Sequence, residues 1–362
     1  MTKYMIFHVP NHLDPQRMSG SHIRPFRMKE AFEAIGYEVD MISGYKDERK
    51  RAMEKIQEKI NRGIHYEFCY SESSTMPTEL TESHHLPTTF GLDFGFFKRL
   101  KKRGIPIGLF YRDCYWLFDE YKEATSFLKG QLAIRFYKRD LKKYKELVDI
   151  LYLPHESMAK HLPISYDKVS SLPPGIDELE EGKTTPIPPL ELFYVGGMTG
   201  HYNLEMIFSI VSQMDKVHLT VCTRASEWSK VKERYKKYLA KNIEIIHGDK
   251  TVYRPYLERA DLGIIFTEPT EYWDFAVPVK LFEYLRYGIP VLGNPFTATE
   301  KIIEKAGFIV DYDEKSLKDQ LERILKSPNI LEAKKKSVME FRKEHLWTKR
   351  AEKVERELKN IR

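Results

Sequence analysis

The stretch that decides the fold runs from Val277 to Gly293 and reads VPVKLFEYLRYGIPVLG. Its first half carries apolar residues at helical spacing, namely Leu281, Phe282, Leu285 and the aromatic Tyr284. Gly288 should end this helix, and the apolar run after it predicts a buried strand. Lys280 and Glu283 lie three residues apart, on one helical face. A lysine at a helix N-terminus favours phosphate, and a carboxylate one turn later can bind a ribose diol. The stretch predicts a nucleotide-diphosphate site; a surface salt bridge on an amphipathic helix is the alternative.

The same stretch resembles the donor-binding signature of GT-B glycosyltransferases, in particular glycosyltransferase family 4 (glycosyl transferases group 1). The residues that carry the resemblance are Pro278, Lys280, Glu283-Tyr284-Leu285, Gly288 and Pro290-Val291. Another common version of the signature has two glutamates eight positions apart, but here Phe275 stands where the first would be. The nearby carboxylates, none at the family's spacing, are Glu268, Glu271 and Asp274.

Length and composition fit a two-domain enzyme. A chain of 362 residues, 42% apolar and 31% charged, is long enough for two full cores. The three cysteines are far apart and show no metal-ligand spacing, so a disulfide framework is not expected. The first residues read as a buried strand rather than a signal peptide, and no run reaches the length of a spanning helix. We therefore expect a cytoplasmic protein.

Strands and helices alternate along the chain in two series, which predicts parallel sheets with helices on both faces. Strands are expected at Lys3–Val9, Tyr37–Ile42, Ile64–Tyr70, Ile105–Tyr111, Ile150–Leu153 and Lys168–Leu172, and near 190–195, 217–222, 243–247, 262–266, 289–293 and 307–310. Helices are expected at Ser21–Ile35, Asp47–Arg62, Phe94–Lys102 and Ser126–Leu147, and a long final stretch has a possible break at 345–347.

The predicted fold is α/β, with two Rossmann-like domains facing across a cleft (GT-B). A stretch rich in proline and glycine marks the linker. The expected divisions are an acceptor-binding domain at 1–173, a linker at 174–189, a nucleotide-sugar domain at 190–340 and a C-terminal helix at 341–362. The resemblance implies that this helix crosses back onto the first domain.

Further donor-site candidates follow the strands of the second series. Gly196 and Gly197 come directly after a strand and after the linker, where small residues let a backbone approach a pyrophosphate. The lysine that the family often carries a few residues later is absent, and Arg224 is the candidate to replace it, with a solvated arginine as the alternative. Tyr253 is the candidate for the nucleobase region, with core packing as the alternative.

The first domain is expected to bind the acceptor. Gly20 and Ser21 form a possible acceptor or phosphate loop before the first helix, with a simple N-cap as the alternative. Asp113 follows a buried strand among Tyr111, Tyr115 and Trp116, and aromatic faces beside a carboxylate suit a sugar. Asp113 is therefore the first catalytic candidate, against a helix-capping role, and His22 is the second.

Basic residues concentrate between Lys98 and Lys145. This segment holds fourteen Lys and Arg against five acids, a net charge of +9, whereas the whole chain carries +6. In the expected helix Ser126–Leu147, basic residues alternate with apolar ones. A basic amphipathic helix of this kind is typical of a protein that binds an anionic membrane surface; a solvated helix face over an ordinary core is the alternative. No nucleic-acid motif is present, so a nucleic-acid partner is not expected.

The predicted function is transfer of a sugar from a nucleotide-diphosphate donor to a glycan or lipid-linked acceptor, in cell-surface polysaccharide synthesis, on the inner face of the membrane. The resemblance implies a retaining reaction in which cationic groups replace a divalent metal, so no cofactor and no metal are expected. The alternatives are an inverting GT-B enzyme with Asp113 as base, a nucleotide-sugar epimerase on the same fold, and a non-catalytic sugar-nucleotide-binding subunit.

Overall fold

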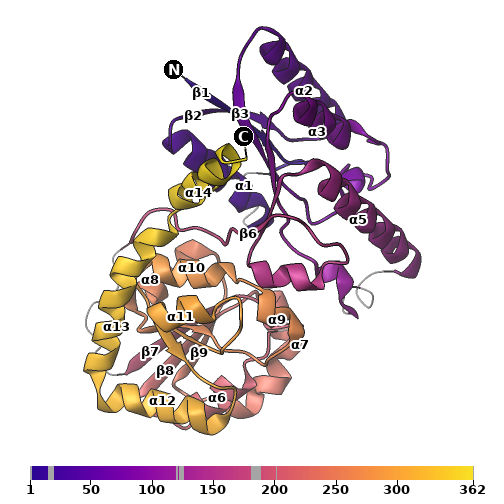
Figure 1. Ribbon diagram of the computed structural model, residues 1–362. Coiled ribbons are helices and arrows are strands. Elements are labelled where there is room, and N and C mark those ends of the chain that lie inside the picture. Colours follow the sequence, from indigo (N-terminus) through magenta and orange to yellow (C-terminus); the bar gives the residue numbers. More distant parts are fainter. Residues whose placement is uncertain are drawn as a thin grey trace. The chain divides into compact units, whose positions relative to one another are not determined.

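The computed structural model describes residues 2–14, 20–119, 121, 126–180, 189–200 and 202–361. The chain divides into two compact units (Figure 1). Unit 1 consists of Met1–Pro174 together with Trp347–Arg362, and unit 2 consists of Gly175–Leu346. Each unit contains a six-stranded sheet in which every recorded strand pair is parallel, as the alternation of strands and helices predicts. The expected two-domain α/β fold is confirmed.

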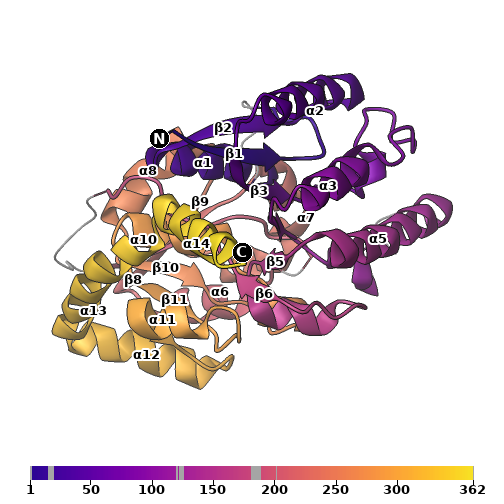
Figure 2. The ribbon, with the colours of Figure 1, turned by 45° about the horizontal axis from the view of Figure 1, so that its top comes forward.

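The sheet of unit 1 has the strand order β2-β1-β3-β4-β5-β6. Its strands are β1 (Lys3–His8), β2 (Tyr37–Ile42), β3 (Tyr66–Glu72), β4 (Ile107–Phe110), β5 (Ile150–Leu153) and β6 (Val169–Ser171). Its helices are α1 (Gly20–Ala34), α2 (Lys46–Asn61), α3 (Leu92–Lys102), α5 (Phe127–Leu147) and α14 (Trp347–Lys359), with 3-10 turns η1 (Thr78–Leu80), η2 (Tyr115–Leu117) and η3 (Glu156–His161). Helices α1 and α14 cover one face of the sheet, and α2, α3 and α5 cover the other (Figures 1 and 2).

The C-terminal helix α14 belongs to the core of unit 1. Ala351, Val354 and Leu358 are fully buried and pack with α1 and the sheet. Gly108 on β4 makes room for this helix, since a Cβ added there would lie 3.0 Å from Leu358. The expected return of the C-terminal helix to the first domain is therefore confirmed. The 3-10 turn η5 (Arg342–His345) interrupts the final helical stretch, so the expected break is also present, and the division between the units falls after Leu346.

The sheet of unit 2 has the strand order β12-β11-β10-β7-β8-β9. Its strands are β7 (Leu190–Val195), β8 (Val217–Cys222), β9 (Ile243–Ile246), β10 (Leu262–Ile265), β11 (Val291–Gly293) and β12 (Gly307–Ile309). Its helices are α6 (Glu205–Val211), α7 (Ala225–Tyr235), α8 (Lys250–Arg259), α9 (Glu271–Phe275), α10 (Val279–Arg286), α11 (Glu300–Ala306), α12 (Glu314–Lys326) and α13 (Pro328–Phe341), with a 3-10 turn η4 (Lys236–Tyr238). Counted from β7, this is the Rossmann strand order, in which ligands bind at the carboxyl ends of the strands where the order reverses. The reversal lies between β7 and β10.

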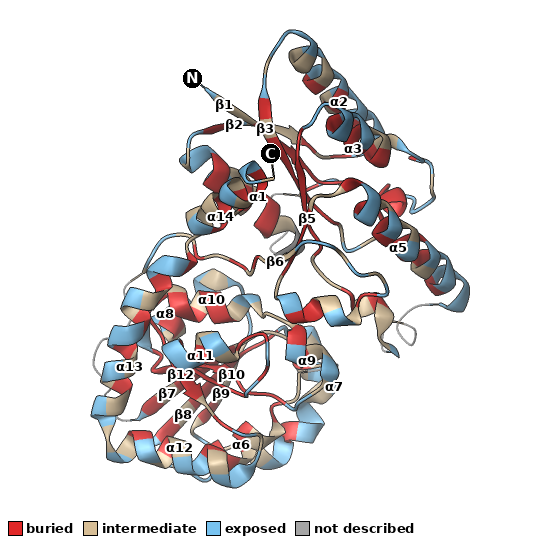
Figure 3. Ribbon diagram, viewed as in Figure 1, coloured by how far each residue is buried: buried red, intermediate tan, exposed pale blue. Residues whose placement is uncertain are grey.

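Burial follows the sequence pattern in both units, with buried residues on the strands and the inner faces of the helices (Figure 3). The stretch from Val277 to Gly293 forms helix α10 and strand β11. Gly288, in a left-handed conformation (φ +67°), lies between them. The described part of the expected linker is fastened to unit 2, because Arg286 pairs with Asp177 and Glu180. Among the described residues, no helix is long and apolar enough to cross a membrane.

Candidate functional site

The glycine turn after β7 meets the first turn of α10. Gly196 has a φ of +145°, and a Cβ added to it would lie 2.8 Å from Nζ of Lys280. The peptide N–H of Gly196 donates to the carbonyl of Cys222, 3.0 Å away, which fixes the turn to the end of β8. Glycine is thus required at this position both for its backbone conformation and for the close approach of the lysine. The structure brings together two of the predicted donor-site residues.

Lys280 is a partly buried cation among aromatic rings. Its Nζ lies 3.8 Å from the ring centroid of Tyr194 and 5.0 Å from that of Tyr202. Within the described residues no carboxylate lies at ion-pair distance from it. Burial lowers the pKa of Lys280 to about 7. Because desolvation is not offset by a counter-ion, an anion at this position would stabilise the charged form.

The second glycine of the turn lies against a carboxylate from α7. A Cβ on Gly197 would lie 3.0 Å from Oε2 of Glu227, and the same oxygen accepts a hydrogen bond from the N–H of Met198 at 2.9 Å. The other oxygen, Oε1, pairs with Nη1 of Arg224 at 2.8 Å. Arg224 is 82% exposed, so it lies at the surface beside the turn. Sequence reasoning missed Glu227, although its position three residues after Arg224 at a helix start was a usable signal.

Glu283 and Tyr253, both of which the sequence analysis places at the donor site, contact each other. The Tyr253 hydroxyl donates to Oε1 of Glu283 at 3.0 Å, and Nζ of Lys250 lies 4.0 Å from the same oxygen. Burial raises the pKa of Glu283, and the hydrogen bond from Tyr253 opposes that shift. The Tyr253 ring lies 6.1 Å from the Phe193 ring, so it also packs against β7.

Tyr284 links the signature helix to the point where the strand order reverses. Its hydroxyl accepts the N–H of Val195 at 3.3 Å and lies 3.5 Å from the carbonyl oxygen of Ile264. Its ring lies over Gly263, where any Cβ would overlap it. The sequence pattern identifies this tyrosine only as part of an apolar stripe. In the structure its hydroxyl forms hydrogen bonds with backbone groups of both β7 and β10.

In the region before α10, Phe275 stands where the family's signature has its first glutamate. Phe275 is buried, with 2% of its surface exposed. Glu268 accepts a hydrogen bond from Asn203 at 2.8 Å, and Asp274 accepts the hydroxyl of Thr297 at 2.6 Å. Among the described residues no group of three or more His, Cys, Asp or Glu could hold a metal ion.

In unit 1 the first catalytic candidate makes a capping contact. Oδ1 of Asp113 accepts the N–H of Tyr115 at 2.9 Å, at the start of the 3-10 turn η2, which is the contact expected from the capping alternative. Nδ1 of His22 accepts the N–H of Asp14 at 3.0 Å. Gly20 and Ser21 are the first residues of α1, so the expected loop is already helical there, and their side chains lie outside the described residues.

Sequence reasoning also missed Glu72, a fully buried carboxylate at the end of β3. It pairs with Nε of Arg24 at 3.1 Å and with Nη2 of Arg112 at 3.2 Å, and it accepts the Tyr70 hydroxyl at 3.0 Å. The guanidinium of Arg24 also lies 3.6 Å from the centroid of the Phe110 ring. The acid at the end of an otherwise apolar strand was the available signal.

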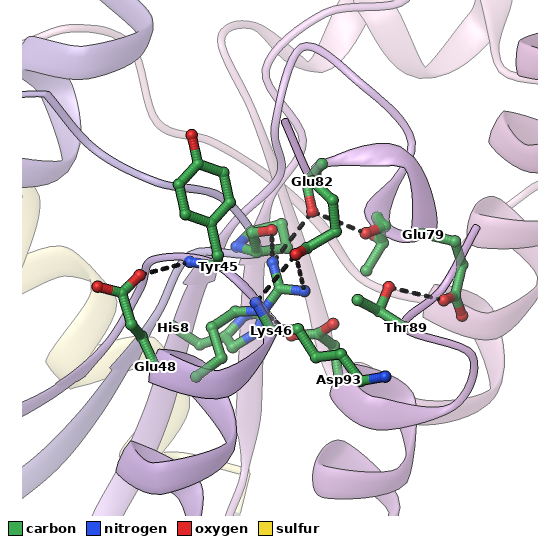
Figure 4. Close-up of polar contacts among 12 residues, drawn as sticks. His8, Tyr45, Lys46, Glu48, Glu79, Glu82, Thr89 and Asp93 are labelled. Atoms are coloured by element: carbon green, nitrogen blue, oxygen red, sulfur yellow. Dashed lines mark hydrogen bonds and ion pairs between the residues drawn. The ribbon is translucent and has the colours of Figure 1, made fainter. Parts of the chain in front are cut away.

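A second buried ionic cluster lies near the starts of α2 and α3 (Figure 4). Nε2 of His8 lies 2.8 Å from Oδ1 of Asp93, and Nδ1 lies 2.8 Å from the Ser71 hydroxyl. Arg49 is fully buried and pairs with Asp93 at 3.4 Å and with Glu82 at 3.5 Å. In this cluster, as around Glu72, buried charges of opposite sign face each other.

Comparison with solved structures places the chain in a fold class. It is similar to sucrose-phosphate synthase of Thermosynechococcus elongatus, with a TM-score of 0.65 and 14% identity over 99% of both chains. It is similar to HepE of Anabaena in complex with UDP, with a TM-score of 0.63 and 10% identity over 98% of this chain and 100% of that one. It is also similar to WaaG, a glycosyltransferase involved in lipopolysaccharide biosynthesis, with a TM-score of 0.57 and 13% identity over 98% and 99%.

These similarities and the two parallel sheets define the GT-B class of two-domain proteins. Residues 189–327, which form most of unit 2, match the family model described as glycosyl transferases group 1. No curated protein sequence matches the chain. The match covers the glycine turn, Arg224, Tyr253 and α10, so it spans every donor-site residue predicted above. The predicted resemblance is thereby confirmed, and the protein is a glycosyltransferase of the GT-B fold.

Proposed function

We propose that the enzyme transfers a sugar from a nucleoside-diphosphate donor bound by unit 2. The observation that carries this proposal is the environment of Lys280. Its ammonium group is desolvated, and no carboxylate of the described residues lies at ion-pair distance from it. Its Nζ lies 2.8 Å from the position that a Cβ on Gly196 would occupy, so it faces the glycine turn. A leaving diphosphate at this position gains the lysine charge, the backbone of the glycine turn and the N-terminus of α10. Arg224 adds a second cation when Glu227 releases it.

The nucleoside half of the donor binds, in this proposal, at Glu283 and Tyr253. Glu283 lies one turn further along α10 than Lys280, and its carboxylate already accepts one hydroxyl, that of Tyr253. A ribose diol offers hydroxyl donors of the same kind. Burial raises the pKa of this carboxyl because it destabilises the charged form, and hydrogen bonds from ribose hydroxyls would stabilise that form.

Nucleoside diphosphates test the donor site without any assumption about the acceptor. UDP, GDP and ADP should be screened by thermal denaturation, and the one that binds should stabilise the protein by about 2.7 kcal/mol at a hundredfold excess over its dissociation constant. Lys280→Met should reduce this stabilisation, whereas Lys318→Met, which changes an exposed lysine of α12, should leave it unchanged. If none of the three nucleotides raises the melting temperature of the wild type, the proposed donor site is wrong.

The acceptor in this proposal is a glycan or lipid-linked sugar of cell-surface polysaccharide synthesis, handled at the inner face of the cell membrane. The positive charge of the segment 98–145 supports binding to an anionic membrane surface. WaaG, one of the proteins of similar fold, is involved in lipopolysaccharide biosynthesis. Incubation of the purified chain with nucleotide sugars and lipid-linked acceptors tests this directly. Transfer by the chain alone also excludes a non-catalytic subunit, and the family match already favours a transferase over an epimerase.

The stereochemical course is proposed to be retaining, with Asp113 as a sugar-positioning group. Asp113 accepts the N–H of Tyr115 and lies three residues after the carboxyl end of β4. The carboxyl ends of strands are where α/β sheets bind ligands. An inverting enzyme with Asp113 as general base is the second candidate. The anomeric configuration of the product, read by NMR, decides between them.

A further inference from the structure

Helix α5 presents two chemically different exposed segments along one face. The first two turns expose large apolar side chains: Phe127 is 76%, Leu128 81% and Leu132 45% exposed. The remaining turns expose cations at spacings of three and four residues, which place them on the same face. These cations are Arg135, Lys138, Lys142 and Lys145. The opposite face is buried against unit 1.

The exposed cations are not neutralised within unit 1. Arg139 pairs with Glu79 and Lys143 pairs with Glu146. By contrast, none of the four cations on the exposed face makes an ion pair with any described residue. Their charge is therefore available to an external anionic surface.

The loop before α3 extends the apolar segment. Phe90 is 61% exposed, and its ring lies 6.0 Å from that of Phe136 on α5. The guanidinium of Arg139 lies 5.2 Å from the Phe90 ring centroid, so the loop is held against the helix. We call the set Phe90, Phe127, Leu128, Leu132, Arg135, Lys138 and Lys142 the α5 edge. Figure 3 shows that the end of α5 away from the sheet is exposed.

We propose that the α5 edge docks on an anionic lipid bilayer, with Phe127, Leu128 and Leu132 inserted below the headgroups and the cationic residues lying on them. This deepens the proposed function, on which it rests for the lipid-linked acceptor. Apolar side chains that are this exposed gain by leaving water, and the cations gain from the negative surface potential. A second copy of the chain fits poorly, because pairing two α5 edges would bring like charges together. A nucleic acid would pair with the cations but offers no apolar phase in which Phe127 and Leu128 could be buried.

A labelling experiment tests insertion separately from charge attraction. All three native cysteines are buried, so one introduced cysteine can carry a polarity-sensitive fluorophore. The sites are Gln131→Cys between the apolar residues, Lys145→Cys at the other end of the helix, and Leu239→Cys on unit 2 as a control. With vesicles of phosphatidylcholine and phosphatidylserine (7:3), the label at 131 should shift to the blue, the label at 145 much less, and the control not at all.

Two outcomes of this experiment would overturn the proposal. No shift at 131 would mean that the apolar segment does not enter the bilayer, and equal shifts at 131 and 145 would mean that the apolar residues do not determine which part of α5 inserts. A blue shift at 131 that grows with protein concentration without vesicles would mean that the edge pairs with a second copy instead.

Matched variants separate the two parts of the edge. Arg135→Gln with Lys138→Gln and Lys142→Gln should weaken vesicle binding at least tenfold at 0.1 M salt. Phe127→Ser with Leu128→Ser and Leu132→Ser should leave weak binding that 0.5 M salt removes, because only the screened charge term remains. Both variants should keep the nucleoside-diphosphate stabilisation of the wild type, which shows that they fold and that the donor site is intact. Wild-type vesicle binding by either variant would contradict the proposal.

Discussion

The two units share a parallel six-stranded architecture, and each contains paired buried charges, in unit 2 those of Lys335 and Asp261. They differ in that unit 2 also holds a cation that is not paired with a carboxylate of the described residues. In unit 1 two buried acids lie between basic side chains: Glu72 lies between Arg24 and Arg112, and Asp93 lies between His8 and Arg49. In unit 2 Lys280 faces two tyrosine rings, with no carboxylate at ion-pair distance among the described residues. Paired charges hold a fold together, whereas an unmatched cation beside the glycine turn after β7 is available to an anionic ligand. This difference supports the proposal that unit 2 binds the diphosphate of the donor.

Strand order carries the same lesson. In unit 1 the order reverses between β1 and β3, and the side chains there, His8 and Ser71, are bonded to each other. In unit 2 it reverses between β7 and β10, and the Tyr284 hydroxyl reaches the backbone of both strands while the glycine turn lies open to Lys280. At the reversal point of unit 1, two side chains are hydrogen-bonded to each other. At the reversal point of unit 2, the cation Lys280 lies beside the glycine turn.

The largest effect is expected from opening a closed cluster of unit 1. Arg49→Met leaves Asp93 and Glu82 buried without their shared cation, which should cost about 3–5 kcal/mol of stability. Urea denaturation measures this. Arg51→Met, on the exposed face of the same helix, is the control and should change stability by less than about 0.5 kcal/mol. If the two variants are equally stable, the ionic clusters do not hold unit 1 together.

Removing the unmatched cation of unit 2 should affect turnover rather than stability. Lys280→Met takes away a preorganised charge from the leaving diphosphate and should lower kcat by about 10²–10³, or about 2.7–4 kcal/mol in barrier. Steady-state kinetics with the nucleotide sugar measures this, with Lys318→Met as the exposed control.

The pH dependence of nucleotide binding checks the same residue. Because the pKa of Lys280 is about 7, the free enzyme loses this charge as the pH rises through 7, while a bound diphosphate raises the pKa. Affinity should therefore be greatest below pH 7 and fall by up to about tenfold per pH unit above it. In Lys280→Met the affinity should not change between pH 7 and 9. A flat profile in the wild type would show that Lys280 does not contact the diphosphate.

Asp113→Asn tests whether unit 1 supplies a reacting group as well as packing. We expect turnover to fall at least tenfold, about 1.4 kcal/mol in barrier, with little change in nucleoside-diphosphate affinity. A loss of about a hundredfold or more with an inverted product would make Asp113 the general base. Unchanged turnover with a lower melting temperature would leave it as the cap of η2.

A smaller effect is expected at the nucleoside end of unit 2. Glu283→Gln should weaken nucleoside-diphosphate binding by about tenfold, and Tyr253→Phe by less, because one neutral hydrogen bond contributes about 0.5–1.5 kcal/mol. Isothermal titration measures both. Inorganic pyrophosphate should bind the two variants as it binds the wild type; weaker pyrophosphate binding would place Glu283 at the phosphates.

Chelation should have no effect. We propose that cationic side chains and the N-terminus of α10 stabilise the leaving group without a divalent metal. Activity should then survive EDTA, measured with the same donor and acceptor. Loss of activity that Mg²⁺ or Mn²⁺ restores would show that the charge assignment in unit 2 is incomplete.

The sequence predicted the fold closely because the fold rests on local patterns. Tyr37–Ile42 and Ile150–Leu153 are strands over the residues predicted, and most other boundaries differ by one or two residues. The strand order could not be derived in the same way, because it depends on which distant strands pair. Residues on one helix, such as Lys280 and Glu283, were found from spacing alone.

Partners from distant elements were harder to find. Glu227 and Glu72 were missed because each acts through residues that the fold brings close, a backbone N–H at 198 and an arginine at 24. Tyr284 was assigned to an apolar stripe because its ring is aromatic and falls at helical spacing, and the sequence does not show where its hydroxyl points.

The packing of α14 has a consequence for synthesis on the ribosome. Unit 1 begins at the N-terminus, yet Ala351, Val354 and Leu358 complete its core. Domains usually fold from the N-terminus as the chain emerges, but here unit 2 is translated in full before the last helix of unit 1 leaves the exit tunnel. A chain that ends at residue 346 would lack α14, so its unit 1 would have an uncovered apolar surface between α1 and the sheet. Chaperone binding to such chains, and its loss once α14 has emerged, follows from this order.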